Sequence, residues 1–376
     1  MIPPLDLQAA TDELRPQLQD VFARFLDSGR YVLGPEVEAF ESEYAAFCGA
    51  ADCVGVSSGL DALHLALRAA GIGPGDEVIV ASNTYIATWL AVTHAGADVV
   101  PVEPDRLTHN IDPTLIPEKI TSRTKAILAT SLYGLPVDYE QIRTIAANAG
   151  LLFLTDNAQA SGAQYHGRPV GGIADLECHS FYPTKNLGAL GEAGAVTTSD
   201  PQFAGRLRML RNYGSTQRYH HEIPGFNSRL DELQAGILRV KLTVLDEWNR
   251  RRRQIAAVYQ TRLRDCRGII LPVEPDRMLH AWHLYVVQPA RRDEIQELLR
   301  RRDIGTLIHY PVPPHRSPAY QSAGFAPEQF PVANALADRV LSLPMGPHLT
   351  EAAAAEVCDA LVSVLSCPAD EPRMAG

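Results

Sequence analysis

The chain has 376 residues, of which 46% are hydrophobic and 21% charged, and its formal net charge is -10. This composition excludes a disordered, collagen-like or disulfide-scaffold protein, and the length predicts a soluble globular protein with two domains. The acidic balance argues against nucleic acid as a partner, and we interpret the one basic run, residues 249–254, as a solvated helix face.

Six cysteines are scattered along the chain without a CxxC pair or another metal-binding spacing: Cys48, Cys53, Cys178, Cys266, Cys358 and Cys367. This scatter predicts reduced thiols, with no disulfide and no structural zinc. The first residues lack the basic and apolar regions of a signal peptide, and no run approaches the ~20 apolar residues of a membrane-spanning helix. We therefore expect a cytoplasmic protein without a membrane partner.

Short apolar runs alternate with amphipathic segments between residues 50 and 200, which is typical of a parallel sheet with helices on both faces. The predicted strands cover residues 53–58, 77–82, 98–103, 125–133, 151–156, 178–182 and 194–199. Several of these runs end in a polar residue of the kind that caps a helix. Helix N-termini should therefore gather along one edge of the sheet, where open α/β folds bind their ligands.

The remaining chain has a different pattern. Residues 228–263 predict one long helix without proline, which we interpret as a bridge between two domains. Residues 281–289 alternate like a half-buried strand, residues 292–304 predict a helix, and the last ~30 residues predict a closing helix. We predict a large domain over residues 1–245 and a smaller α+β domain over residues 246–376, with the boundary between 240 and 265.

Asp156 ends an all-apolar strand, and Lys185 follows another strand end 29 positions later. Taken alone, Asp156 is readily explained as a helix cap and Lys185 as a surface charge. Together they match two requirements of pyridoxal phosphate: an amine that forms a Schiff base with its aldehyde, and a carboxylate that keeps its pyridine nitrogen protonated.

The other requirements of this cofactor also have candidates. Its phosphate needs hydroxyls and backbone N–H groups at a helix N-terminus, which Ser58 and Gly59 offer, with Ser180 as a further donor. Its ring needs an aromatic face, which Tyr85 supplies at another strand end.

Seven motifs, spread over nearly the whole chain, resemble in order and spacing the DegT-type sugar aminotransferases, which belong to fold-type I of the pyridoxal phosphate enzymes. The motifs are GVSSGLDALHLAL, NTYIATW, TDNAQASGA, SFYPTKNLGALGEAGAV, RNYGS, GFNSRLDELQAGIL and HYPVPPH. Within the family, the chain looks most like the 3-aminotransferases of dTDP-3-keto-6-deoxyhexoses, the desosamine-pathway enzyme among them. The resemblance implies a large domain with a mostly parallel seven-stranded sheet sandwiched by helices.

The resemblance also implies residue roles. Lys185 is the catalytic lysine that binds the cofactor, Asp156 the partner of its pyridine nitrogen and Gln159 a contact to its ring hydroxyl. The other implied cofactor contacts are Tyr85, which stacks on the ring, and the phosphate-binding Ser58, Gly59 and Ser180. Asn227 reaches the phosphate of the neighbouring subunit in this family, which implies a homodimer with shared active sites.

Substrate-side candidates follow from the same motifs. His309, Tyr310 and Tyr213 are substrate-binding residues by resemblance, although the prolines after Tyr310 are also consistent with a simple rigid loop. Arg229 is a candidate for binding an anionic substrate. We do not expect His220 and His221 to bind a metal, because adjacent side chains seldom face one ion. Glu192, between turn glycines, should form a local backbone bond rather than act as an acid or base.

The implied reaction transfers an amino group from L-glutamate to a nucleotide-linked keto-6-deoxyhexose, at C3 of a dTDP-3-keto sugar. A 4-keto sugar, a UDP-linked 3-keto sugar and a keto-cyclitol are alternative acceptors. Two other classes remain. A pyridoxal phosphate-dependent sugar dehydratase of this fold has histidine in place of the lysine, so Lys185 argues against it. A non-enzymatic regulator that binds the cofactor is disfavoured because no helix-turn-helix segment or basic face is apparent.

Overall fold

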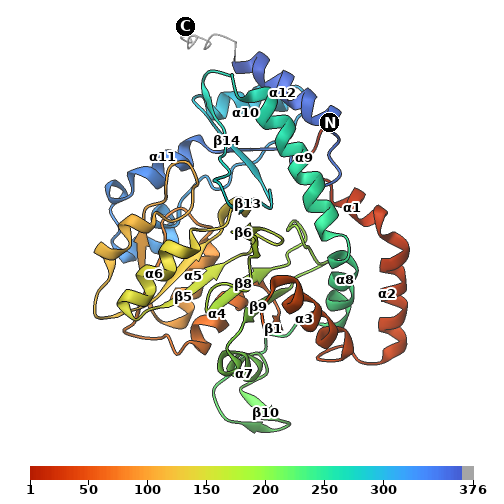
Figure 1. The fold of residues 1–376 in the computed structure, drawn as a ribbon, viewed down its shortest axis with the longest axis vertical. Coiled ribbons are helices and arrows are strands. Elements are labelled where there is room, and N and C mark those ends of the chain that lie inside the picture. The colour runs from red at the N-terminus through yellow and green to blue at the C-terminus, as the bar shows by residue number, and fades with distance from the viewer. Residues whose placement is uncertain (366–376) are drawn as a thin grey trace.

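The computed structural model describes residues 1–365, and a seven-stranded sheet lies at its centre (Figure 1). The strands are β1 (Asp52–Val56), β2 (Glu77–Ala81), β3 (Asp98–Val102), β4 (Thr124–Thr130), β5 (Leu152–Asp156), β8 (Leu176–Ser180) and β9 (Gly194–Thr198), in the order β1-β9-β8-β5-β4-β2-β3. In this sheet β9 is antiparallel to both neighbours, and every other pair is parallel. The predicted strands and the mostly parallel sheet are confirmed.

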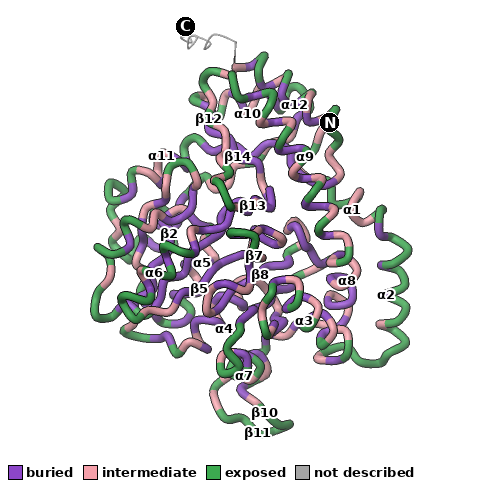
Figure 2. The backbone as a smooth tube through the Cα atoms, viewed as in Figure 1, coloured by how far each residue is buried: buried purple, intermediate pink, exposed green. Residues whose placement is uncertain are grey.

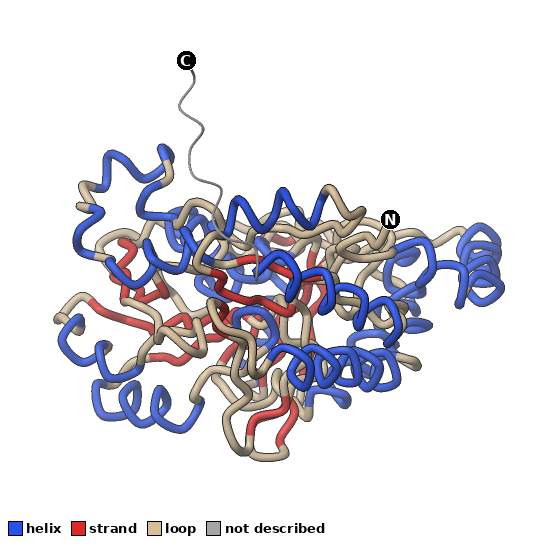
Figure 3. Tube along the Cα trace, turned by 90° about the horizontal axis from the view of Figure 1, so that it is seen from above, coloured by secondary structure: helices blue, strands red, loops and turns tan. Residues whose placement is uncertain are grey.

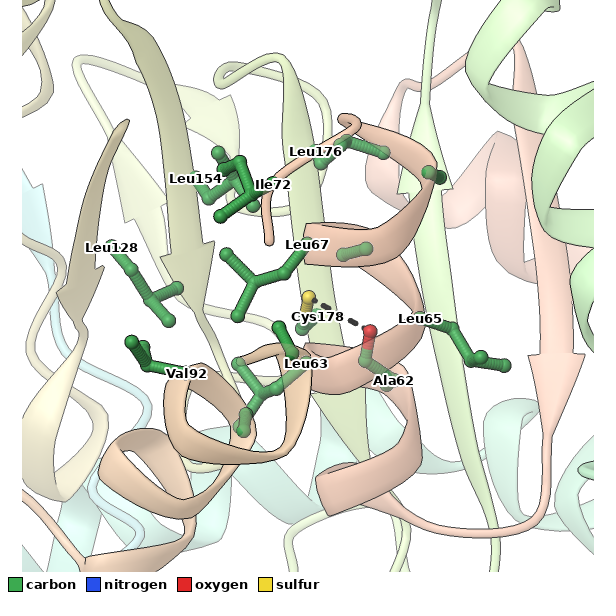
Figure 4. Packing of buried hydrophobic residues seen from close by; sticks show 14 of the residues in the cluster. Ala62, Leu63, Leu65, Leu67, Ile72, Val92, Leu128, Leu154, Leu176 and Cys178 are labelled. Atoms are coloured by element: carbon green, nitrogen blue, oxygen red, sulfur yellow. Dashed lines mark hydrogen bonds between the residues drawn. The ribbon is translucent and has the colours of Figure 1, made fainter. Parts of the chain in front are cut away.

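Helices cover both faces of the sheet. They are α3 (Pro35–Cys48), α4 (Gly59–Ala69), α5 (Ile86–Ala95), α6 (Tyr139–Ala149) and α7 (Pro201–Leu210). The first two helices, α1 (Leu7–Glu13) and α2 (Arg15–Ser28), pack instead against Ile237 and Trp248. Neighbouring residues of a strand point to opposite faces, so Leu154 packs in the cluster of α4 and α5 while Phe153 packs in the cluster of α6. Figure 4 shows Leu63 and Leu67 of α4 in the first cluster. Because both faces are covered, β2, β8 and β9 are buried at every residue.

The predicted single helix over residues 228–263 is wrong. The chain forms α8 (Glu232–Leu242) and α9 (Leu245–Leu263), with Thr243 and Val244 between them. Val244 departs from ideal helical angles, with φ -113° and ψ 0°, and the hydroxyl of Thr243 donates to the carbonyl of Val240 at 2.7 Å. Two successive β-branched residues disfavour a continuous helix. The Thr243 hydroxyl also gives the Val240 carbonyl a side-chain hydrogen bond, which competes with the backbone bond of a continuing helix. In Figure 1, α9 alone extends toward the C-terminal part of the chain.

The C-terminal part has its own core. Its helices are α10 (Arg292–Arg300), α11 (Pro331–Arg339) and α12 (Glu351–Leu365), and β12 (Ile269–Ile270), β14 (Tyr285–Pro289) and β15 (Leu341–Leu343) form a small antiparallel sheet. Tyr259 of α9 packs there with Tyr285 and Leu361. The strand predicted over 281–289 begins only at Tyr285, since Trp282 has a φ of 48°. The helix predicted over 292–304 ends at Arg300. The division into domains at residues 245 and 246 stays a prediction, and its last residues, 366–376, lie outside the described part.

The remaining elements are short. The hairpin of β10 (Ser215–Gln217) and β11 (His220–His221) projects from the body beside α7 and is largely exposed (Figures 1 and 2). A further small sheet joins β6 (Gln164–Tyr165), β7 (Arg168–Pro169) and β13 (Met278–Leu279). The 3-10 helices cover Pro113–Leu115, Pro117–Lys119, Leu132–Gly134, Pro314–Arg316, Pro318–Ala323 and Pro327–Gln329. Seen from above, helices surround the strands (Figure 3).

Two sequence expectations concern the chain as a whole. In the described residues, no helix combines the length and apolar character needed to cross a membrane. The five cysteines before residue 366 are free thiols, and Cys367 lies outside the described residues.

Candidate active site

Asp156 and Lys185 lie at the same edge of the sheet. Asp156 is the last residue of β5, which runs parallel to β8, and Lys185 follows the end of β8 by five residues. The Asp156 carboxylate is buried and accepts hydrogen bonds from the Thr88 hydroxyl at 2.8 Å and from the Ala158 N–H at 3.1 Å. Burial raises the pKa of Asp156, while Thr88, Ala158 and the charge of Lys185 act in the opposite direction. The carboxylate thus lies in the field of the lysine.

The amine of Lys185 is electrostatically unusual. Burial lowers the pKa of Lys185 to about 8, although the Asp156 charge pulls it upward. No hydrogen bond or ion pair engages its Nζ within residues 1–365. An amine with this pKa has a substantial neutral fraction at neutral to mildly basic pH, and the neutral form is the one that attacks a carbonyl carbon.

An anion-binding geometry occurs at the start of α4. Ser58 caps this helix by accepting the N–H of Asp61 at 3.1 Å, and Gly59 is the first helical residue. A Cβ atom placed on Gly59 would lie 2.5 Å from the Cβ of Ser180, so only glycine lets Ser180 approach the helix end. The free N–H groups of a helix N-terminus, together with the Ser180 hydroxyl, suit a phosphate.

Aromatic side chains gather near Gln159. Tyr85 lies just before α5, is half exposed, and has its ring centroid 5.1 Å from that of Tyr310. The Gln159 amide donates to the Tyr310 hydroxyl at 2.9 Å and accepts the N–H of Tyr133 at 2.6 Å. Gln159, Tyr85 and Tyr310 therefore form one connected group.

His309 belongs to the same region. Its Nδ1 lies 2.8 Å from the Ser342 hydroxyl. Burial and the nearby Lys185 charge lower the pKa of His309 to about 4, so the ring is neutral at physiological pH. The structure thus brings His309 and Lys185 together, although 124 positions separate them in the sequence.

The other predicted residues form a second group. Asn227 is exposed and lies in a β-bridge with Asn212. The Arg229 guanidinium donates to the Asn212 side chain at 3.0 Å and lies 5.4 Å from the centre of the Tyr213 ring. Within the described residues, no hydrogen bond or ring contact joins this group to Lys185.

The sequence did not point to three residues of the site: Thr88, Asn186 and His283. Thr88 holds Asp156 and lies one helical turn after Tyr85 in NTYIATW, so the motif contained the signal. Asn186, next to Lys185, donates to the carbonyl of Ala281 at 2.8 Å, and its Oδ1 lies 3.2 Å from Nδ1 of His283. No local pattern could have revealed this network, because its members are nearly 100 positions apart.

The remaining candidates have ordinary surroundings. His220 and His221 lie on the exposed hairpin, where Nδ1 of His221 is 2.9 Å from the carbonyl oxygen of Tyr213. Within residues 1–365, no group of three or more metal-ligating side chains is arranged around a common point. Glu192 is exposed and forms none of the expected backbone bonds in the described part, so that expectation is wrong.

The family follows from a direct comparison. A model of the DegT/DnrJ/EryC1/StrS aminotransferase family matches residues 12–362. The chain belongs to this family. It is 54% identical over 356 residues to the "Erythromycin biosynthesis sensory transduction protein EryC1" of Saccharopolyspora erythraea, covering 95% of this chain and 97% of the relative. It is also 54% identical over 362 residues to the dTDP-3-amino-3,4,6-trideoxy-alpha-D-glucose transaminase of Streptomyces venezuelae, covering 96% and 95%.

Solved structures of the family agree with the fold. DesV of S. venezuelae, solved in complex with a ketimine intermediate, superposes with a TM-score of 0.96 at 52% identity, covering 98% of this chain and 99% of DesV. A Bacillus subtilis relative solved with bound pyridoxamine phosphate (PMP), at 30% identity, has a TM-score of 0.87 and covers 94% and 83%. The fold class is confirmed, and the chain is an aminotransferase of this family.

The site of this aminotransferase fits pyridoxal phosphate. Its donor set contains an amine without a partner in the described residues, a buried carboxylate with hydrogen-bond donors but no ion pair, and a helix N-terminus that a glycine leaves open to Ser180. These groups match the aldehyde, the ring nitrogen and the phosphate of the cofactor respectively.

Proposed function

We propose that this chain is a pyridoxal phosphate-dependent aminotransferase that moves an amino group from L-glutamate to C3 of a dTDP-linked 3-keto-6-deoxyhexose, in deoxyamino sugar biosynthesis. The observation that carries the proposal is the pairing of Lys185 with Asp156 at neighbouring strand ends, in a chain so similar to a dTDP-3-amino sugar transaminase. The assignment of C3 and of the dTDP nucleotide rests on that relative.

The geometry supports a cofactor-binding role for each of six residues. Asp156 would hold the ring nitrogen, Tyr85 would stack on the ring and Gln159 would contact the ring hydroxyl. Ser58, Gly59 and Ser180 would hold the phosphate. When bound, pyridoxal phosphate supplies an aldehyde for the incoming amine and a ring that accepts the electrons of the bond that breaks.

The chain itself supplies the proton transfers. In its neutral form, Nζ of Lys185 can take a proton from the α-carbon of the amino donor, and the resulting ammonium would return that proton to the carbon that carried the cofactor's aldehyde. Hydrogen bonds from Thr88 and Ala158, together with the charge of this ammonium, favour the ionised form of the buried Asp156 against the effect of burial. In the second half of the reaction, the same Nζ works in the opposite direction at the sugar carbon.

Substrate recognition is assigned to the aromatic and basic side chains around the site. His309 and Tyr310 lie beside Lys185 and Gln159, where the sugar would react. Tyr213 and Arg229 stack on one another on an exposed face, and Arg229 would bind an anionic group of a substrate.

We propose a homodimer with shared sites and a cytoplasmic location. Asn227 is exposed, and within the described residues no hydrogen bond or ring contact joins its group to Lys185, which supports a role in the site of a second copy. Exposed apolar side chains such as Phe22, Leu190 and Tyr182 are consistent with a covered face.

A regulatory function is the second candidate, because a relative with 54% identity has a name that describes sensory transduction. A sugar dehydratase is disfavoured, since Lys185 occupies the position at which that branch has histidine. A 4-keto sugar, a UDP-linked 3-keto sugar and a keto-cyclitol remain alternative acceptors.

The test uses 15N-labelled glutamate and a panel of acceptors. The enzyme is incubated with the dTDP-3-keto-6-deoxyhexose, its 4-keto isomer and a UDP-linked 3-keto sugar, and NMR locates the label. We expect label at C3 of the first sugar, none with Lys185→Ala, and unchanged transfer with the exposed-lysine control Lys125→Ala. Label at C4, or preference for the UDP sugar, would contradict the acceptor assignment. Absence of any labelled product would favour the regulatory function.

A further inference from the structure

A cavity lies next to the loop that contains Lys185. Its wall includes Lys185 and Gly188 of the loop, Lys241 of α8, Arg252 of α9 and Asp6 near the N-terminus. The space open to the centre of a water molecule is about 50 Å³. One water needs roughly 10–15 Å³ on this measure, so the cavity has room for a small ion or a few waters.

Lys241 is a buried cation in this wall. Its side chain is 5% exposed, and its Nζ donates to the carbonyl of Gly188 at 2.6 Å. That carbonyl is neutral, and within residues 1–365 Lys241 forms no ion pair. Burial lowers the pKa of Lys241 to about 8, which reflects the missing negative partner.

Arg252 is the second buried cation. It is 3% exposed and donates to the carbonyls of Trp282 at 3.1 Å and His283 at 3.2 Å. Its Nε is buried and has no hydrogen-bond partner among the described residues. Burial lowers the pKa of Arg252 to about 10. The sequence interpretation of residues 249–254 as a solvated face is therefore wrong at Arg252, and also at Asn249, which is 1% exposed.

No carboxylate in the wall neutralises these two charges. Among residues 1–365, Asp6 is the only acidic residue in this wall; it is exposed and caps α1 by accepting the N–H of Ala9 at 2.9 Å. Removing a cation from water without a counter-charge is costly, and a buried guanidinium N–H without an acceptor adds to that cost. An anion in the cavity would offset both.

We propose that this cavity binds one small monovalent anion of the chloride class between Lys241 and Arg252. The available room excludes a nucleotide sugar. The site is separate from the phosphate position at the start of α4, and the inference does not depend on the proposed sugar substrate. Since Lys185 shares the wall, a bound anion would favour its charged form and so reduce the reactive neutral fraction.

The first test is 35Cl NMR on the holoenzyme, in which the cofactor phosphate already occupies the α4 site. We expect a saturable broadening of the chloride signal that disappears in Lys241→Gln. Glutamine keeps a donor for the Gly188 carbonyl but removes the charge. The control is Lys119→Gln, which removes a charge from an exposed position and should leave the broadening unchanged. Absence of saturable broadening, or equal broadening in Lys241→Gln, would overturn the proposal and leave a cavity that holds water only.

A second measurement needs no variant. Crystals of the wild-type holoenzyme are grown in bromide, and anomalous scattering locates the halide. We expect a peak within hydrogen-bond distance of both Nζ of Lys241 and the guanidinium of Arg252. A map with bromide at other surface positions but none in this cavity would overturn the proposal, even if Lys241→Gln does not fold.

Discussion

Lys185 reacts as a base because of where it is buried. The strand end places its amine beside Asp156, and burial outweighs that favourable charge, so the pKa falls from 10.5 to about 8. The neutral fraction of the amine should therefore rise with pH and reach one half near pH 8, about two units below the value for a solvated lysine.

This titration can be measured without the cofactor. Acetylation of Lys185 in the cofactor-free protein, followed by peptide mass spectrometry from pH 6 to 11, should show a rate that rises and levels off with a midpoint near pH 8. Exposed Lys125 provides the reference in the same digest. A Lys185 midpoint above pH 10 would mean that the amine is solvated and not buried as described.

Asp156 provides the second prediction at this scale. Asp156→Asn removes the negative charge but keeps the shape, and Thr88 and Ala158 can still donate to the amide oxygen. We expect the variant to retain cofactor, while its rate of reaction with glutamate falls by about 10²-fold or more. Absorbance spectra measure retention and stopped-flow measures the rate, with the exposed Asp265→Asn as the control. A rate within twofold of wild type would contradict the assigned role.

At the scale of elements, α4 connects packing with ligand binding. Gly59→Ala would place a methyl group 2.5 Å from the Cβ and 3.2 Å from the Cα of Ser180, so rotating the serine side chain would not relieve the clash. We expect this change to lower the melting temperature and weaken pyridoxal phosphate retention during dialysis. The matched control is Gly205→Ala in α7, where nothing lies within 4 Å, and which should stabilise the protein by about 0.5–1 kcal/mol. Unchanged cofactor retention in Gly59→Ala would argue against the phosphate position.

Local sequence patterns predicted much of the sheet but few of the contacts between residues that lie far apart in the sequence. All seven strands were recognisable because β5 and its neighbours are apolar runs that end in polar residues, such as Asp156. The break at Val244 was missed because the apolar periodicity continues through it. The burial of Arg252 was also hidden, because its partners are the carbonyls of Trp282 and His283, 30 or more positions away. The partner of Gln159 at Tyr310 was out of reach for the same reason.

For the whole molecule, the central prediction is that two chains build each site. Lys185→Ala and Asn227→Ala can be co-expressed with different tags and the hybrid dimer purified. If Asn227 serves the partner's site, the hybrid contains one site with both native residues and should recover about half of the wild-type activity. If Asn227 serves its own chain, neither site is intact and activity stays at or below that of the Asn227→Ala dimer, which is the control.

The most direct test of the account is the absorbance spectrum of the purified holoenzyme before and after L-glutamate, with Lys185→Ala beside it. If Lys185 forms a Schiff base with the cofactor, the holoenzyme absorbs visible light. We predict that glutamate removes the visible band of the wild type and releases one equivalent of 2-oxoglutarate, and that the variant gives neither change. A wild-type spectrum that does not respond to glutamate, in protein that carries the cofactor, would contradict the claim that Lys185 and Asp156 form a glutamate-dependent aminotransferase site.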